Sequence, residues 1–163
     1  MSGKVLPLPA AQSERERLRG RGLRVVLTNG HFDLLHVGHV RYLQAASSLG
    51  DRLVVGLNGD DTTRRLKGEG RPYVCEDERA ELLAALACVD YVVIFREATA
   101  ESLVDTLRPD VYVKGGDYAA GKPLPEAKIV AAYGGVTQIL PFQEGRSTTA
   151  LIQRIQSSSA STT

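Results

Sequence analysis

Two histidines three residues apart, His36 and His39, are the side chains whose type and spacing most directly suggest chemistry. They lie in a stretch, 28–39, that follows an apolar, β-branched run over 23–27 and precedes apolar residues at helical spacing over 40–49. This pattern predicts a strand, a tight turn and the start of a helix. Residues three apart share one face of a helix. Both imidazoles are therefore expected beside the helix's free N–H groups, where an anion such as phosphate binds favourably.

The other residues of this turn favour a ligand site over a packed histidine. A single histidine near a helix start is more often a cap or a packed side chain than a catalyst. Here Gly30, Gly38 and Asp33 crowd the same turn as the two histidines, and Gly38 lets a ligand approach the backbone. A zinc site of the His-Glu-x-x-His kind is excluded, because that motif needs a spacing of four and a glutamate after the first histidine.

Length and composition set the class of protein. The 163 residues suggest one domain, and the net charge of +1 excludes a nucleic-acid or membrane binder that acts through its whole surface. With two cysteines, no long apolar stretch and no signal-peptide core, the sequence favours a cytoplasmic protein. Residues 1–20 are predicted to be a loose extension, in which 13–21 could form a short solvated helix. The Ser/Thr-rich end, 157–163, is predicted to be disordered.

Short apolar strands alternate with helical segments along the chain, which predicts an α/β fold. It would be a single Rossmann-like, doubly wound domain with a five-stranded parallel sheet. The predicted strands are 23–29, 52–58, 91–95, 111–113 and 136–140. The predicted helices are 38–49, 77–87, 100–107 (capped by Thr99), 125–133 and 150–156.

The loops after four of these strands carry an unusual set of polar groups. Because the strands are parallel, these loops meet at one edge of the sheet, where α/β proteins bind ligands. A cationic, Gly-rich loop over 64–72 follows the second strand. Together the loops predict a polyphosphate receptor with several cations and two helix starts. Beside the histidines, its residues are Lys67, Lys114, Gly115, Gly116, Asp117, Arg146, Ser147, Thr148 and Thr149. Asp117 is the carboxylate that could hold a ribose hydroxyl or an amine.

Several well-known site motifs are missing. There is no Gly-x-x-x-x-Gly-Lys-Ser/Thr run, no dinucleotide glycine pattern after the first strand and no Gly-x-Ser-x-Gly elbow. Neither cysteine lies in the four loops, so no nucleophile is evident, and the carboxylate cluster of a two-metal enzyme is absent.

The run 29–39, from Asn29 to His39, resembles the His-x-Gly-His signature of the nucleotidylyltransferase superfamily. Further runs resemble one branch of it, the adenylyltransferases that make ADP-heptose from D-glycero-β-D-manno-heptose 1-phosphate. Those runs are 50–55, 65–68, 71–72, 89–90, 109–110, 113–118 and 145–149. The resemblance covers about 23–156, which implies a nucleotidylyltransferase domain over 21–156.

The resemblance implies that a sugar 1-phosphate attacks the α-phosphorus of ATP in line and displaces pyrophosphate, without a covalent intermediate. A sugar phosphate is already an anion near neutral pH, so positioning and charge stabilisation suffice. Mg²⁺ carried by the ATP phosphates would assist, and no protein residue is assigned as a metal ligand.

The resemblance also assigns roles to the residues of the site. His36, His39, Lys67 and Thr148 would stabilise the transition state, with Lys67 bridging the phosphates of both substrates. The nucleotide would be bound by Asn29, Gly30, Phe32, Asp33, Gly38, Arg79, Lys114, Gly115, Gly116, Asp117, Arg146, Ser147 and Thr149. Within this set, Phe32 would offer its backbone N–H to a phosphate and Gly30 would keep the floor of the site open. Asp33 could instead be a structural cap, Arg79 could simply pair with Glu76 or a neighbour, and Lys114 could be a solvated strand end.

Two features depart from the family pattern. His31 stands where the family more often has a small or apolar residue, and the 119–127 segment differs from the fused enzymes, which leaves the sugar open. Enzymes of this branch are often fused to a kinase, and this sequence shows no kinase half, so we expect a separate heptose kinase. The resemblance also implies a homodimer or larger assembly.

Two other functions compete with adenylyl transfer. The first is a cytidylyltransferase acting on glycerol 3-phosphate or a similar small phosphate. Such enzymes usually carry a Trp-rich loop after the fourth strand, and this chain has no Trp. The second is a non-catalytic nucleotide-binding module, which need not keep all of His36, His39, Lys67 and the threonine pair.

Overall fold

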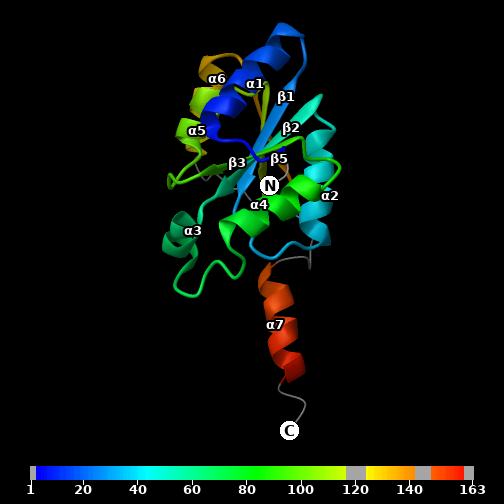
Figure 1. Cartoon of the computed structure of the whole chain (residues 1–163), viewed down its shortest axis with the longest axis vertical. Helices are drawn as coiled ribbons and strands as arrows, with labels where there is room; N and C mark the ends of the chain where they lie inside the picture. Colours follow the sequence, from blue (N-terminus) through cyan, green and yellow to red (C-terminus); the bar gives the residue numbers. More distant parts are fainter. Residues whose placement is uncertain (1–2, 117–123, 142–147, 160–163) are drawn as a thin grey trace.

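The computed structural model describes residues 3–116, 124–141 and 148–159. Its centre is a five-stranded parallel sheet with the order β3-β2-β1-β4-β5, which confirms the predicted fold class (Figure 1). The strands are β1 (Val25–Gly30), β2 (Arg52–Asn58), β3 (Tyr91–Phe95), β4 (Val111–Gly115) and β5 (Val136–Leu140). Strand order reverses between β1 and β4, so the crevice expected to hold a ligand opens beyond the carboxyl ends of these two strands.

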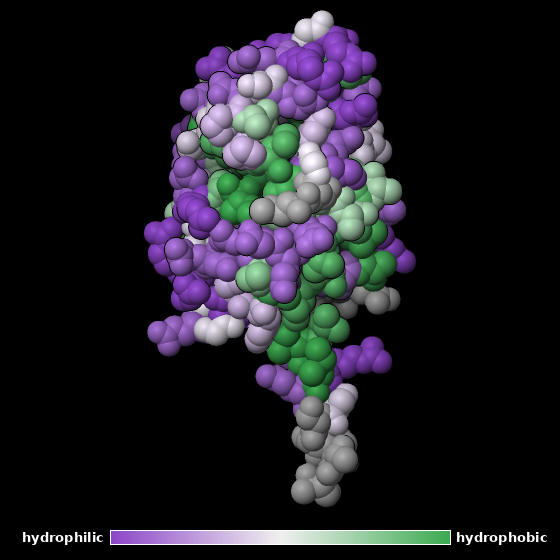
Figure 2. Space-filling model, in the orientation of Figure 1, coloured by the Kyte–Doolittle hydropathy of each residue, from purple (hydrophilic) through white to green (hydrophobic). Residues whose placement is uncertain are grey.

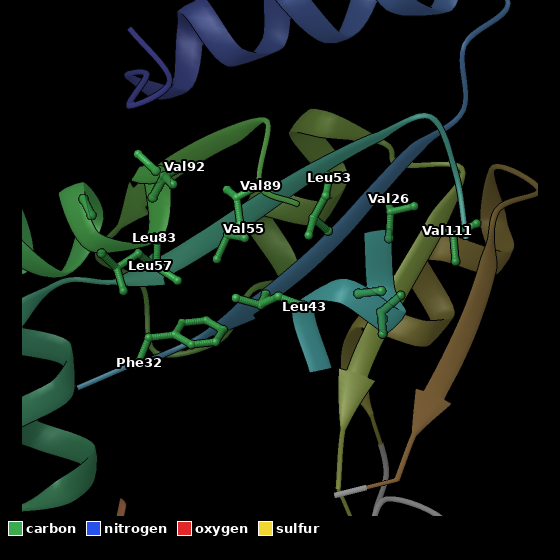
Figure 3. Packing of buried hydrophobic residues seen from close by; sticks show 14 residues of the cluster. Val26, Phe32, Leu43, Leu53, Val55, Leu57, Leu83, Val89, Val92 and Val111 are labelled. Atoms are coloured by element: carbon green, nitrogen blue, oxygen red, sulfur yellow. The ribbon is translucent and has the colours of Figure 1, made fainter. Parts of the chain in front are cut away.

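Helices cover both faces of the sheet. They are α1 (Leu8–Gly20), α2 (Val37–Ser47), α3 (Asp60–Lys67), α4 (Glu76–Ala85), α5 (Glu101–Leu107), α6 (Pro125–Ala132) and α7 (Thr148–Ser159). One buried cluster joins the sheet to α2 and α4, and a second joins it to α1, α5 and α6. Figure 3 shows the first cluster, in which Val26, Leu53 and Val55 of the strands pack near Leu43 of α2.

The strands are apolar on both sides because both sides are covered. Along β1, Val26 belongs to the cluster with α2 and α4, whereas Val25 and Leu27 belong to the cluster with α1, α5 and α6. This alternation makes a buried parallel strand read as a continuous apolar run. Glu76, Asp77 and Glu78 occupy the first turn of α4, where the helix dipole favours acidic side chains.

The amino-terminal segment is packed against the sheet, whereas the sequence suggested a loose extension over 1–20. Val5 forms a parallel bridge with Val92, and α1 buries Ala11 and Leu18. Arg15, also on α1, is 5% exposed; it donates to the Arg108 carbonyl and pairs with Asp110 at 3.1 Å. The expectation was wrong because the few apolar residues of this charged helix share one face, and that face covers the sheet.

The segment over 64–67 is helical, although a cationic loop was predicted from 64 to 72. It is the second half of α3, whose first turn carries Asp60 and Asp61 and whose last turn carries Arg64, Arg65 and Lys67. This charge distribution suits the helix dipole. The loop prediction failed because the helix has few apolar residues and shows no apolar periodicity.

Smaller differences occur at helix ends. Thr99 does not cap α5, since its hydroxyl donates to the Glu101 carboxylate and the N-cap position belongs to Ala100. The last helix runs from Thr148 to Ser159, beyond the predicted limits of 150 and 156, so residues 157–159 of the expected disordered tail are helical. Among the described residues, none of the helices has the length and apolar character needed to cross a membrane.

Candidate active site

Three polar side chains meet where strand order reverses. The Asn29 Oδ1 atom at the end of β1 accepts hydrogen bonds from the Tyr112 hydroxyl at 2.6 Å and from the Lys114 Nζ at 3.1 Å. Tyr112 and Lys114 are two residues apart on β4 and therefore lie on the same side of the strand. Burial lowers the pKa of Lys114, although Glu126 opposes that shift. Lys114 is thus a partly buried member of this network, not the solvated strand end offered as an alternative.

The turn after β1 is shaped by Phe32. Its φ angle is +46°, in the left-handed region, and its ring is 94% buried, with an exposed fraction of 6%. A Cβ atom at Gly30 would lie 2.9 Å from the Phe32 ring, so the ring fills the space that this glycine leaves. Gly30 therefore makes room for Phe32, where the sequence suggested a floor left open for the ligand. Figure 3 shows the ring beside Leu43 and Leu57 of the core.

His36 and His39 lie together at the start of α2, as their spacing predicted. His36 is the N-cap residue, and its Nδ1 accepts a hydrogen bond from the Gly38 N–H at 3.1 Å. An acceptor Nδ1 leaves the proton of the neutral ring on Nε2, which can donate. The two imidazoles stack with centroids 3.9 Å apart, and the Phe32 ring meets His39 edge-on at 5.3 Å. The cap and the ligand-facing role are therefore compatible in one residue.

His39 is neutral at pH 7. Burial, with a smaller contribution from His36, lowers its pKa to about 4. Its buried Nδ1 has no hydrogen-bond partner within the part of the chain that the structure describes. The pair thus presents polar nitrogens at a helix start without placing two positive charges 3.9 Å apart.

The lowered pKa values of His31 and His39, both about 4, predict a fold that weakens in acid. In the unfolded chain both rings bind protons with the ordinary histidine pKa of 6.5, so between pH 6.5 and 4 the unfolded state holds more protons. The free energy of unfolding should therefore fall as the pH falls through this window. Urea unfolding above and within the window measures it, and His31→Leu should reduce the slope. Equal wild-type stability at both pH values would contradict the prediction.

Asp33 fixes the loop that precedes α4. Its carboxylate accepts hydrogen bonds from the backbone N–H groups of Tyr73 and Val74 at 2.7 and 3.1 Å. It also pairs with Arg71 at 2.8 Å, and the Arg71 guanidinium lies 4.5 Å from the centre of the Tyr73 ring. The geometry favours the structural role for Asp33. Its carboxylate joins the segment 31–39, between the end of β1 and the first turn of α2 and here called the histidine turn, to a loop about 40 residues away.

Arg79 is a fully buried arginine that holds four segments together. It donates to the carbonyls of His31, Asn58 and Val74, and it pairs with Asp60 at 2.7 Å. Its side chain is 0% exposed. Arg79 therefore supports the site through the backbone of the turn after β1 and through the Asp60 carboxylate at the start of α3.

Glu76 is not the partner of Arg79, although the sequence offered it as one. Its carboxylate pairs with Arg96 and accepts the backbone N–H of Asp60. Glu76 belongs to α4, but its carboxylate lies beside the Asp60 backbone at the start of α3. Spacing along the sequence could therefore not show which of the two carboxylates pairs with Arg79.

Lys67 and His31 are brought together from two different elements. Lys67 ends α3 and is exposed. Burial first, and then the charges of Lys67, Arg79 and Lys114, lower the pKa of His31 to about 4, with Asp33 acting in the opposite direction. The charges of the two predicted cations, Lys67 and Lys114, therefore both act on the His31 imidazole.

Other predicted site residues are placed less closely or fall outside the description. Gly115 ends β4, and the Gly116 N–H donates to the Leu140 carbonyl with a φ of +105° at Gly116. Asp117, Arg146 and Ser147 lie outside the described residues. Thr148 and Thr149 begin α7, which lies at the same end of the sheet as the start of α2 and runs away from the sheet (Figure 1). The contact between Thr148 and the histidines stays a prediction.

Three contributors escaped the sequence analysis: Thr63, Arg71 and Tyr112. Tyr112 gave a usable signal, since a hydroxyl interrupts a buried apolar strand two residues before Lys114. Thr63 and Arg71 gave none, because their partners His31 and Asp33 are more than 30 residues away.

The arrangement can bind and polarise phosphates. It offers a helix start with two histidines, two lysines whose charges both act on His31, and the Asn29 amide. Among the described residues no group of three or more His, Cys, Asp or Glu side chains could hold a metal ion, and both cysteines are free.

Comparison with known proteins identifies the family. The cytidylyltransferase-like family model matches residues 27–157. The Bifunctional protein HldE of Syntrophotalea carbinolica is 57% identical over 137 residues, which are 84% of this chain and 28% of that protein. The protein of the same name from Geobacter sulfurreducens is 56% identical over 137 residues, with the same coverage. The chain thus spans less than a third of the length of these relatives.

Solved structures agree. The lipopolysaccharide core biosynthesis protein from Thermoplasma volcanium is 30% identical, with a TM-score of 0.61, covering 75% of this chain and 98% of that one. Pantoate–β-alanine ligase from Francisella tularensis, at 13% identity and a TM-score of 0.59, covers 89% of this chain and 68% of that one and shows the shared fold alone. The chain belongs to the cytidylyltransferase-like family and is a nucleotidyltransferase.

Proposed function

We propose that this protein transfers the adenylyl group of ATP to D-glycero-β-D-manno-heptose 1-phosphate, giving ADP-heptose and pyrophosphate. One observation carries the proposal: two stacked histidines lie at the start of α2, and the charges of two lysines act on His31 in the turn before that helix, where strand order reverses. Identity of 52–57% to proteins named HldE supports the heptose substrate.

In this reaction an oxygen of the sugar phosphate attacks the α-phosphorus of ATP. The bond from the α-phosphorus to the bridging oxygen breaks, and the electron pair leaves with pyrophosphate. His36 and His39 would hydrogen-bond the phosphates at the start of α2, where the helix dipole adds to the attraction. Lys67 would bridge the phosphates of both substrates, and Thr148 would bind the leaving group. No protein atom attacks, so the residues need only orient and neutralise two anions.

The remaining residues would form the nucleotide pocket. Asn29 and Lys114 are already joined at the switch point, with Gly115 beside them. Gly116, Asp117, Arg146, Ser147 and Thr149 would complete it. Mg²⁺ would enter with ATP and lower the charge that the phosphates present.

The whole protein would act in the cytoplasm, where ATP is made. A kinase activity would supply the sugar 1-phosphate. A homodimer or larger assembly would cover apolar surface such as Ile155 of α7, which is 57% exposed. Figure 2 shows the apolar side chains gathered on this projecting helix.

A pyrophosphate-release assay tests the function. Four nucleoside triphosphates are crossed with a panel of sugar 1-phosphates and with glycerol 3-phosphate, in the presence of Mg²⁺. We expect the highest kcat/KM with ATP and the heptose 1-phosphate, and a Lys67→Met variant should lose most of it. Preference for CTP with glycerol 3-phosphate would favour the cytidylyltransferase alternative. Release without any acceptor preference would contradict the proposal.

A further inference from the structure

His31 makes a defined contact with the helix that carries Lys67. Its Nδ1 lies 2.9 Å from the Oγ1 of Thr63, which is fully buried. The Thr63 hydroxyl also lies 3.4 Å from the Asn58 carbonyl, to which it donates. A hydroxyl can donate its single proton or accept one, and a neutral imidazole can do either at Nδ1 according to its tautomer. The 2.9 Å contact can therefore form with either group as the donor.

The position of Thr63 on α3 links this contact to Lys67. The two residues are four apart and lie one above the other on the same side of the helix. The charge of Lys67 acts on the His31 ring, so the lysine and the imidazole lie within electrostatic reach. Lysine is a flexible side chain with considerable rotamer entropy. Its position therefore depends on how the last turn of α3 is held.

The other anchors of α3 lie at its first turn and on its far side. Asp60 pairs with Arg79, and the Thr62 hydroxyl and Arg65 both donate to the Arg96 carbonyl. The His31 contact joins α3 directly to a side chain of the histidine turn, one turn closer to Lys67 than the Asp60 pair. The half of α3 that carries Lys67 is thus tied to this turn through the His31 ring, in addition to the link that Arg79 makes at the first turn of the helix.

We propose that His31 is a positioning residue that holds α3, and with it Lys67, against the histidine turn. The inference rests on the proposed function, in which Lys67 bridges two phosphates. A neutral ring suits this role, because a charged one would stand beside Lys67, Arg79 and Lys114 and repel the lysine it positions. Asp33 is the acidic group that acts on the ring in the opposite direction.

A double-mutant cycle tests whether His31 acts through Lys67. His31→Leu removes the hydrogen-bond partner of Thr63, whereas His31→Asn places an amide, which can donate or accept, near the position of Nδ1. We expect His31→Leu to lower kcat/KM for the sugar phosphate about tenfold, since small misplacements of catalytic groups are costly. His31→Asn should recover most of that loss. In a Lys67→Met background, His31→Leu should have no further effect.

Two controls separate this role from general damage. Thr63→Val removes the partner and should reproduce the kinetic effect of His31→Leu, and thermal unfolding of every variant identifies losses due to unfolding. Equal multiplicative effects of His31→Leu with and without Lys67 would overturn the proposal, as would wild-type kcat/KM in His31→Leu.

The cycle is repeated by calorimetric titration with ATP in the absence of an acceptor. If no sugar phosphate is adenylylated but the effects of His31→Leu and Lys67→Met on ATP affinity are non-additive, the proposed function fails and the positioning role stands. Additive effects in both experiments would reject the positioning role alone.

Discussion

Replacing His39 with alanine should lower turnover by about a hundredfold or more while the protein stays folded. A donor aimed at developing transition-state charge contributes about 2.7–4 kcal/mol, which corresponds to this factor. His39 is neutral, stacks on His36 and touches the edge of Phe32, so its orientation is fixed before substrates bind. Pyrophosphate release at saturating substrate concentrations measures the effect.

A matched control lies on the same helix. Gln44 is exposed on α2, and Gln44→Ala should leave turnover within about twofold of the wild type, as expected of a surface position away from the site. Circular dichroism of both variants checks that α2 is intact. If His39→Ala and the wild type turn over equally, the histidine turn is not the reacting site.

The sheet could be predicted from the sequence because its strands carry a local signal. The predicted limits of β2, β3 and β5 agree with the structure, since each is a short apolar run bounded by polar or turn residues. The helices α1 and α3 were missed as packed elements because both are rich in charge. Their placement depends on a few residues, such as Leu18 and Thr63, that are buried only after the sheet exists.

Within the site, the convergence of loops followed from parallel topology, which requires only the order of strands and helices. The ion pairs did not follow, because Asp33 finds Arg71 and Arg79 finds Asp60 across intervening elements. Two acidic residues, Asp60 and Glu76, compete as partners for one arginine in the sequence. Only the folded arrangement decides between them, through burial and the approach of backbone carbonyls.

The second large effect concerns stability. Arg79→Met should lower the free energy of unfolding by about 3–5 kcal/mol, the cost typical of breaking a buried ion pair by removing one partner. Methionine fills a similar volume but offers no donors. Asp60 would lose its guanidinium partner, and the carbonyls of His31, Asn58 and Val74 would lose the donors that satisfy them. Urea unfolding at neutral pH measures the loss.

Arg96→Met is the matched control, since Arg96 forms an ion pair with Glu76 but its side chain is 64% exposed. Glu76 is 16% exposed and keeps the Asp60 N–H as a donor, and an ion pair with an arginine this exposed contributes at most about 1 kcal/mol, so this variant should stay close to the wild type. Arg79→Lys should resemble Arg79→Met, because one ammonium on a flexible chain cannot reproduce the planar set of donors that serves four acceptors. Similar losses in Arg79→Met and Arg96→Met would show that the buried guanidinium does not hold these segments together. The predicted cost of Arg79→Met arises because Arg79, a fully buried side chain, bonds both the turn with the histidines and the helix with Lys67.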